Sequence, residues 1–135
     1  MDYKTILTTC TYCGCGCNFF LEVLDGKLIG TIPCKTSPVN EGKLCIKGWN
    51  VHQFVQSEKR LTSPMIRKND ELKEVSWEEA LDYTANRLKE IKSDHGSDAI
   101  GFFASAKVTN EENYLMQKFA RAAIGTNNVD HCARL

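Results

Sequence analysis

The chain has 135 residues, of which 42% are hydrophobic and 25% are charged, proportions typical of a globular protein with a buried core. Seventeen basic and seventeen acidic side chains cancel, so the charge balance gives no reason to expect nucleic acid or an anionic membrane as a partner. No apolar run approaches the ~20 residues of a membrane helix. The first residues also lack the basic and apolar regions of a secretory signal, so we expect no membrane span and a cytoplasmic location.

Residues 1 to about 60 carry six of the seven cysteines, and in a reducing compartment thiols favour metal binding or catalysis over disulfides. The stretch FFLEVLDGKLIGTI predicts a β-hairpin, because Asp25-Gly26 supplies the two-residue turn that tight hairpins favour. The polar stretch PCKTSPVNEGK contains two prolines and a glycine and is expected to be a loop. LCIKGWNVHQFV predicts a short helix behind a cysteine-bearing turn.

Residues 61–76, LTSPMIRKNDELKEVS, are interpreted as a connector. Ser63-Pro64 breaks any helix, and a short strand or turn is expected around Met65 and Arg67. The predicted domain boundary therefore lies near residue 60, with residues 1–60 as one module and residues 61–135 as the next.

From Ser76 onward the pattern alternates between helix and strand. SWEE is a capping box, in which the Ser76 hydroxyl accepts from the Glu79 amide while the Glu79 carboxylate reaches back. A helix is predicted from there to near Asp94, with Gly96 as its stop.

The almost wholly apolar AIGFFAS predicts a strand buried on both faces. A second helix is predicted from about Asn110 to Gly125, and NNVDHCARL would begin the next strand and turn. The expected fold class is α+β: a small β-rich module followed by an incomplete α/β, helix-on-sheet unit.

Four cysteines have spacing that suits a metal centre. Cys10, Cys13 and Cys17 form C-x2-C-x3-C, and Cys45 returns from a distant loop. Close local thiolates plus a remote one suit the four iron corners of a [4Fe–4S] cluster, and the glycines at 14 and 16 allow tight turns around it. Tetrahedral zinc with four cysteine ligands is the main alternative, although the second short knuckle of a zinc ribbon is missing.

Three nearby side chains are ambiguous from spacing alone. Cys15 lies two residues from both Cys13 and Cys17 and is interpreted as a thiol beside the cluster rather than a ligand. Cys34 has no ligand spacing and is interpreted as a spare thiol. Lys47 follows Cys45 closely; a solvated surface lysine is the simpler interpretation, whereas a cation beside a cluster would stabilise its reduced form.

CTYCGCGC followed by GKLCIKG resembles the amino-terminal cluster module of the molybdenum- or tungsten-bis(pyranopterin) oxidoreductases. LTSPMIR, VSWEEAL and the segment from Tyr114 to Leu135 are similar to the catalytic alpha subunit of formate dehydrogenases. The resemblance covers essentially the whole chain. The cysteine pattern is shared with nitrate reductases and formylmethanofuran dehydrogenases, whereas the last segment points to formate.

The resemblance implies that the cluster ligands are Cys10, Cys13, Cys17 and Cys45. It places Lys47 between the cluster and one pterin, and it does not require a cysteine at position 15. The implied reaction is oxidation of formate to carbon dioxide, with electrons passing from a metal–pterin centre through the cluster to an electron-accepting iron–sulfur or flavin subunit. The full-length enzyme would hold molybdenum or tungsten on a bis-pterin guanine dinucleotide.

In this family the position directly after a segment such as DHCARL carries the cysteine or selenocysteine that binds the metal. This chain stops at Leu135, one residue earlier, and its α/β unit is unfinished. Our hypothesis is that it is the head of a longer enzyme, cut at a UGA codon that encodes selenocysteine; a cloned fragment or a degraded gene are the alternatives. We therefore expect no catalytic residue within the chain and no formate oxidation by it alone. A stand-alone ferredoxin-like carrier and a structural zinc module are the other functions considered.

Overall fold

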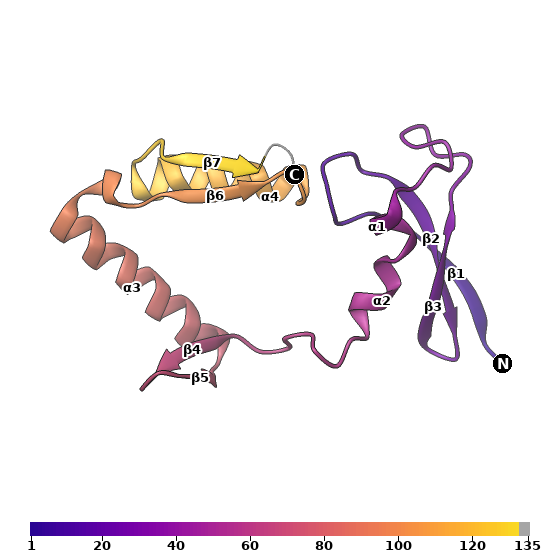
Figure 1. Ribbon diagram of the computed structural model, residues 1–135, viewed down its shortest axis with the longest axis horizontal. Coiled ribbons are helices and arrows are strands. Elements are labelled where there is room, and N and C mark those ends of the chain that lie inside the picture. Colours follow the sequence, from indigo (N-terminus) through magenta and orange to yellow (C-terminus); the bar gives the residue numbers. More distant parts are fainter. Residues whose placement is uncertain (133–135) are drawn as a thin grey trace. The chain divides into compact units, whose positions relative to one another are not determined.

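A computed structural model of the chain describes residues 1–132 (Figure 1). These residues form two compact units: Met1–Arg60 with Ser105–Asn113, and Leu61–Ala104 with Tyr114–Cys132. Both units contain helices and strands, which confirms the predicted α+β class. In the described part of the chain, no helix is both long and apolar enough to cross a membrane. The turn predicted after the last strand falls on residues 133–135, which lie outside the described residues.

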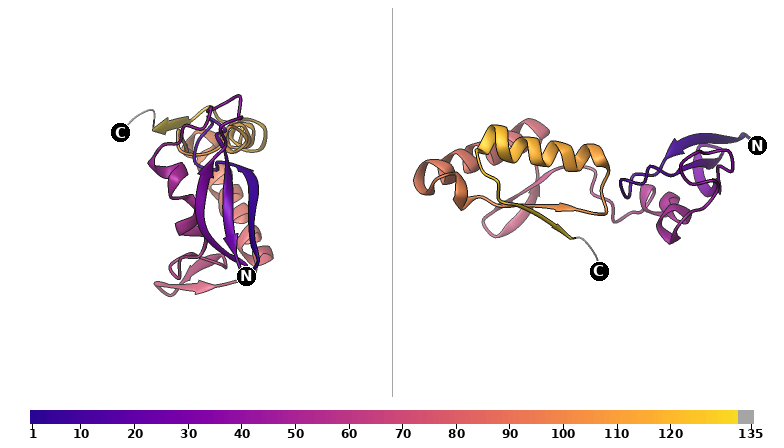
Figure 2. Two further views of the ribbon diagram at one scale, coloured as in Figure 1. Left: turned by 90° about the vertical axis from the view of Figure 1, so that its right-hand side faces the viewer. Right: turned by 90° about the horizontal axis from the view of Figure 1, so that it is seen from above.

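The first unit is built on a three-stranded antiparallel sheet with the strand order β1-β2-β3 (Figure 2). β1 (Tyr3–Thr9) pairs with β2 (Asn18–Leu24) along its whole length, and β2 pairs with β3 (Lys27–Pro33). Asp25 and Gly26 join β2 to β3 with φ values of 45° and 79°, the left-handed values that a tight hairpin turn needs. The predicted hairpin is therefore confirmed. β1 was not predicted, because nearly all of its side chains are exposed and its sequence shows no clear alternation.

Two short helices, α1 (Ile46–Trp49) and α2 (Val51–Val55), lie against β3 on one face of this sheet (Figure 1 and Figure 2). The prediction of one helix is wrong, because the helix is interrupted at Asn50. The Asn50 side-chain amide donates to the Ile46 carbonyl at 2.7 Å, which is the acceptor that the Asn50 backbone N–H would use in a continuous helix. That N–H donates to the Lys47 carbonyl instead, at 3.2 Å.

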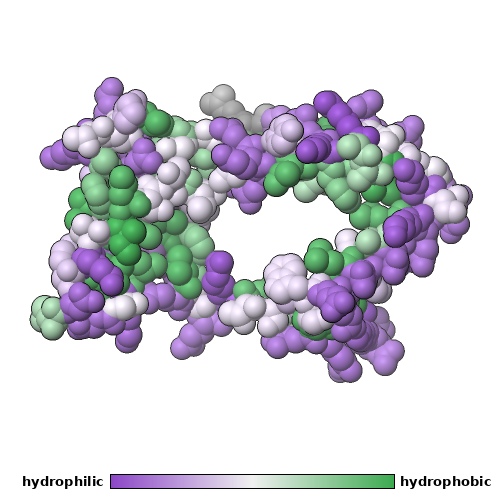
Figure 3. Space-filling model, turned by 180° about the vertical axis from the view of Figure 1, so that it is seen from behind, coloured by the Kyte–Doolittle hydropathy of each residue, from purple (hydrophilic) through white to green (hydrophobic). Residues whose placement is uncertain are grey.

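The core of the first unit is small. Phe19 of β2 is 1% exposed and packs with the buried Cys10 and Val51. Large apolar side chains elsewhere on the sheet stay exposed, among them Ile6 on β1 and Ile29 on β3. Figure 3 shows this hydrophobic surface on the part of the molecule that holds the sheet. The described residues thus bury only part of the apolar surface of this unit.

The second unit begins with a β-hairpin of β4 (Met65–Lys68) and β5 (Glu71–Glu74). Asn69 and Asp70 form its turn, with φ values of 51° and 63°. A short strand or turn was expected around Met65 and Arg67, and the structure shows a strand there. β5 was not predicted, because it is mainly charged and fully exposed, so it carries no hydrophobic alternation.

The long helix α3 (Trp77–His95) begins and ends where the sequence predicts. The Ser76 hydroxyl accepts a hydrogen bond from the Glu79 backbone N–H at 3.1 Å, as expected of an N-cap. The Glu79 carboxylate, which was predicted to reach back toward Ser76, forms an ion pair with Lys68 of β4. The first turn of α3 is therefore tied to the β4–β5 hairpin as well as to its own cap.

A two-stranded sheet follows, in which β6 (Phe102–Ser105) pairs with β7 (Val129–Cys132), and both strands point the same way in Figure 1. The prediction that the AIGFFAS strand is buried on both faces is wrong for the described residues. Ile100, just before the strand, is buried, but the Phe103 side chain is 87% exposed. The described residues thus cover one face of β6 and leave the other open.

The second predicted helix is confirmed as α4 (Asn110–Lys118), which continues directly into a π-helical turn, η2 (Phe119–Ile124). Gly125 ends it with a φ of 87°. The Phe119 ring packs edge-on against the Phe102 ring of β6, with the ring centroids 5.7 Å apart. This contact is the helix-on-sheet packing that the sequence predicted.

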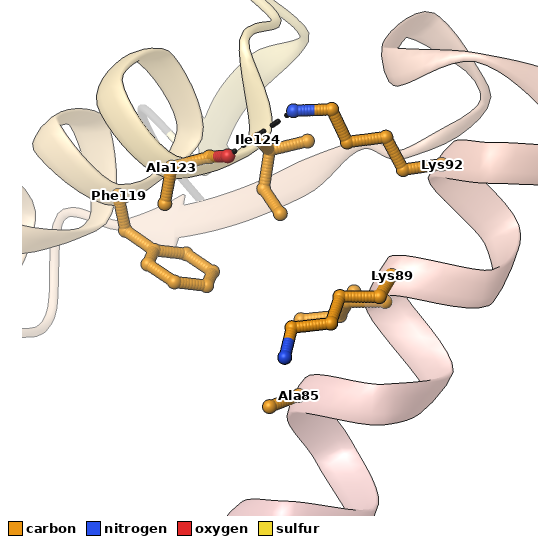
Figure 4. A pocket seen from close by; sticks show the side chains of 7 residues that line it. Ala85, Lys89, Lys92, Phe119, Ala123 and Ile124 are labelled. Atoms are coloured by element: carbon orange, nitrogen blue, oxygen red, sulfur yellow. Dashed lines mark hydrogen bonds between the residues drawn. The ribbon is translucent and has the colours of Figure 1, made fainter.

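A groove of about 220 Å³ lies between α3 and η2 within the second unit (Figure 4). It is lined by Ala85, Leu88, Lys89, Lys92, Phe119, Ala123 and Ile124. The Lys92 ammonium donates to the Ala123 carbonyl at 3.3 Å, and no acid, thiol or imidazole is among the lining side chains. The groove is therefore a packing surface between helices rather than a candidate catalytic or metal-binding site.

The N-cap of α3 is open to a direct test. Replacing Ser76 with Ala removes the acceptor for the Glu79 N–H, and we expect the free energy of unfolding to fall by about 1 kcal/mol. Urea unfolding followed by circular dichroism measures the change. Ser93→Ala on the exposed side of the same helix is the matched control, and equal losses in both variants would contradict the capping role.

Candidate metal centre

Four cysteines lie in the loop between β1 and β2, which is closed at its base. β1 and β2 remain paired up to Thr9 and Asn18, and the Cys10 backbone N–H donates to the Cys17 carbonyl at 2.8 Å. Gly16 adopts a φ of 71°, and a Cβ placed there would meet nothing within 4 Å. The strands thus hold the two ends of the loop together, while its middle keeps a conformation that glycine favours.

The local thiols share one neighbourhood. Cys10 is buried, Cys13 and Cys17 are half-buried, and Cys15 is exposed. Burial, followed by the hydrogen bond with Cys15 and the charges of Cys15, Cys10 and Cys13, raises the pKa of Cys17 to about 11. This environment disfavours a bare thiolate at Cys17, whereas a bound metal would take up the negative charge and release the proton.

Cys45 has the opposite environment. It is exposed and stands at the N-cap position of α1. The Gly48 backbone N–H, which hydrogen-bonds to the sulfur, has the largest effect and lowers the pKa of the Cys45 thiol. Burial, the next largest effect, raises the pKa, and the N–H and ammonium of Lys47 lower it. Donors aimed at sulfur stabilise a thiolate, which is the form that binds a metal. Lys47 itself is half-buried.

Hydrophobic packing joins the two cysteine segments. Leu44, directly before Cys45, packs against the cluster of buried side chains that contains Cys10 and Phe19. Cys17 packs against the same cluster. The segment that carries the remote cysteine is therefore fixed on the core that supports the local ones.

A buried amide makes a second connection that the sequence did not reveal. The Asn40 side chain is 7% exposed and accepts from the Asn18 backbone N–H at 2.9 Å. Its amide group donates to the Asn18 carbonyl at 3.2 Å and to the Lys43 carbonyl at 2.9 Å. Asn18 follows Cys17, and Lys43 lies two residues before Cys45, so one side chain ties both segments together. No spacing rule marks an asparagine in a polar loop for such a role, and only the contact shows it.

Two further cysteines lie outside these two segments of the sequence. Cys34 is buried, with its sulfur 3.5 Å from the Thr36 hydroxyl, and Cys132 lies on β7. Within residues 1–132, no three His, Cys, Asp or Glu side chains come close enough together to hold a metal ion in the geometry shown. The donor chemistry nevertheless fits a thiolate-bound cluster. Local thiols share one loop, the Gly48 and Lys47 amides are aimed at the Cys45 sulfur, and Asn40 ties the two segments together.

Comparison with protein families assigns both parts of the chain. Residues 3–57 match the model described as "Molybdopterin oxidoreductase Fe4S4 domain", and residues 60–135 match the model described as "Molybdopterin oxidoreductase". The chain belongs to the molybdopterin oxidoreductase family. This assignment confirms the predicted cofactor classes of the family, a cluster of the Fe4S4 type and molybdopterin.

Curated members of the molybdopterin oxidoreductase family that are similar to this chain include formate dehydrogenases. This chain is 54% identical over 135 residues to "F420-dependent formate dehydrogenase 1 subunit alpha" of Methanococcus maripaludis. The match covers 100% of this chain and 19% of that one. The identity to the corresponding alpha subunit of Methanocaldococcus jannaschii is 52%, with the same coverage. A putative formate dehydrogenase of Staphylococcus aureus is 48% identical over 131 residues, which is 97% of this chain and 13% of that one. The predicted resemblance to formate dehydrogenase alpha subunits is thus confirmed, and the chain spans less than a fifth of their length.

Among solved structures, the fold resembles acetylene hydratase from Pelobacter acetylenicus, with a TM-score of 0.68 and 24% sequence identity. The match covers 93% of this chain and 18% of the other. At this level of identity the likeness concerns the fold.

The role of Asn40 generates a prediction. Replacing it with Ala leaves the Asn18 and Lys43 backbone groups without their buried partners, and we expect the free energy of unfolding to fall by about 1–3 kcal/mol. Urea unfolding measures this loss, and iron content after anaerobic reconstitution shows whether the two segments still act together. Val39→Ala, an exposed neighbour in the same loop, is the control. If Asn40→Ala and Val39→Ala had the same free energy of unfolding and the same iron content, Asn40 would not connect the two segments.

Proposed function

We propose that this chain is the electron-transfer head of a formate dehydrogenase catalytic subunit. Residues 1–60 would form the [4Fe–4S] module, and residues 61–135 the first part of the molybdopterin-binding α/β domain. The observation that carries the proposal is the combination of 54% identity to a formate dehydrogenase alpha subunit over the whole chain with two cysteine segments that share one core.

The proposed cluster ligands are Cys10, Cys13, Cys17 and Cys45. Three come from the loop whose ends are joined by the Cys10–Cys17 backbone hydrogen bond, and the fourth comes from the segment that Asn40 and Leu44 attach to it. The amides of Lys47 and Gly48 would stabilise the negative charge on the Cys45 sulfur.

A [4Fe–4S] cluster, when bound, accepts and passes on one electron at a time. Lys47 brings a positive charge next to the Cys45 sulfur, and such a charge favours the more negative, reduced state of the centre. We therefore assign Lys47 a role in electron transfer, as a residue that tunes the reduction potential.

The remaining parts of the proposal concern the full-length enzyme. It would bind molybdenum or tungsten on a bis-pterin guanine dinucleotide and oxidise formate to carbon dioxide, and this chain alone is expected not to do so. Its partners would be the rest of the catalytic subunit and an electron-accepting iron–sulfur or flavin subunit. The cytoplasm is the proposed compartment, because a chain with seven cysteines and a thiolate-bound cluster suits reducing conditions.

The ligand assignment is tested by single Cys→Ser substitutions in the 135-residue chain, reconstituted without oxygen. The unsubstituted protein should be brown, with broad absorbance near ~400 nm and about four irons per chain. Substitution at position 10, 13, 17 or 45 should remove or convert the cluster, whereas Cys15→Ser and Cys34→Ser should keep it. A colourless protein with about one zinc per chain would establish the zinc alternative instead. Loss of the cluster in Cys15→Ser would show that the ligand choice is wrong.

Lys47 is tested by Lys47→Gln. Removing the positive charge makes addition of an electron less favourable, so the reduction potential of the cluster should fall. A redox titration followed by electron paramagnetic resonance measures the potential. Lys27→Gln at the turn of the β2–β3 hairpin removes an equal charge at the end of β2 remote from Cys17 and serves as the control. A potential that falls equally in both variants, or does not change in Lys47→Gln, argues against the assigned role.

A further inference from the structure

Two thiols of the cysteine loop are in direct contact. The Cys15 sulfur lies 3.5 Å from the Cys17 sulfur. Cys15 is exposed, whereas Cys17 is half-buried. Neither the family match nor the ligand assignment gives Cys15 a role, so this contact calls for its own explanation.

The backbone around the pair permits the sulfurs to come closer. A disulfide bond is about 2 Å long, so the two atoms need to approach by roughly 1.5 Å. Gly16 lies between the two cysteines, and the space beside its Cα is open to 4 Å. The Cys10 N–H holds the Cys17 carbonyl at 2.8 Å, so an adjustment can take place on the Cys15 side without opening the base of the loop.

We propose that Cys15 and Cys17 form a reversible disulfide when a hydroperoxide reaches the cluster-free loop, and that this disulfide withholds Cys17 from cluster assembly. The second half of this statement rests on the proposed function, in which Cys17 is a ligand. Cys15 would then be a redox partner of a ligand, which explains an exposed thiol at a position that cluster binding does not need.

The reaction balances with hydrogen peroxide as the oxidant. The sulfur of Cys15, which solvent reaches first, attacks one peroxide oxygen; the O–O bond breaks, a sulfenic acid forms and one water leaves. The Cys17 thiol then attacks the Cys15 sulfur, the S–O bond breaks and a second water leaves. Two thiols lose two electrons and peroxide gains them. A dithiol reductant reverses the bond, whereas oxidation of Cys17 to a sulfinic acid would be irreversible.

The other thiols of this part of the chain offer a contrast. Cys34 is buried, and its sulfur contacts the Thr36 hydroxyl at 3.5 Å. Cys13 has a half-buried side chain, so peroxide reaches it less readily than Cys15. Among the four cysteines of the loop, Cys15 is therefore the exposed thiol, and the 3.5 Å sulfur contact identifies Cys17 as its partner.

The test uses the full 135-residue chain, purified without cluster and fully reduced, then treated with one equivalent of hydrogen peroxide. Remaining thiols are blocked with one alkylating reagent, and disulfides are then reduced and marked with a second. Trypsin releases residues 5–27 as one peptide with all four local cysteines, so fragmentation in the mass spectrometer assigns each label to a residue. We expect the second label on Cys15 and Cys17. A second label on Cys10 and Cys13 instead, or its absence from the peptide, overturns the proposal.

Matched variants and reconstitution complete the experiment. Cys15→Ser should abolish the oxidised product, whereas Cys34→Ser should leave it unchanged. The oxidised chain should take up at least several-fold less iron and sulfide than the reduced chain, with recovery after dithiothreitol, and Cys15→Ser should lose this sensitivity to peroxide. Equal uptake by oxidised and reduced chains refutes the withholding step. If the reduced chain takes up no cluster at all, the proposed function and the withholding step fail together, while the labelling result still decides whether the disulfide forms.

Discussion

The arrangement of the first unit depends on the buried side chain of Asn40. Its oxygen accepts from the Asn18 N–H, and its nitrogen donates to the Asn18 and Lys43 carbonyls. These are backbone groups of two segments far apart in the sequence, and each segment leads directly to a cysteine. A buried polar side chain with all its contacts satisfied restricts both backbones, because losing any one contact would leave an unpaired group away from water. One buried amide, which is not itself a proposed ligand, therefore contacts both cysteine-bearing segments.

The two segments present sulfur in opposite electrostatic settings. Burial and neighbouring thiols raise the pKa of Cys17, whereas the amides of Gly48 and Lys47 and the Lys47 ammonium lower that of Cys45. The Cys45 thiol therefore loses its proton more readily than the Cys17 thiol. Crowding also brings Cys15 against Cys17, so the property that suits the loop to metal binding exposes it to oxidation.

The second unit is held by different means. The π-helical turn η2 meets the two-stranded sheet through ring packing of Phe119 on Phe102. The Ser97 hydroxyl, beyond the end of α3, donates to the Ile124 carbonyl of η2 at 2.7 Å. The buried side chains of this unit are few, and Phe103 remains exposed on the strand. The chain spans less than a fifth of the length of the formate dehydrogenase alpha subunits that it matches.

Local chemistry allowed the sequence by itself to determine several features. Asp25-Gly26 defines a hairpin turn, Ser76 and Gly96 bound α3, and the cysteine spacing indicates a thiolate centre. Each of these signals lies within a few neighbouring residues. The tertiary structure alone decided the rest. β1 and β5 lack hydrophobic alternation and exist through pairing with their neighbours, and α1 and α2 are separated because the Asn50 side chain takes the Ile46 carbonyl. The tie made by Asn40 and the contact of Cys15 with Cys17 depend on where folding places side chains in space, and no periodicity or spacing encodes that information.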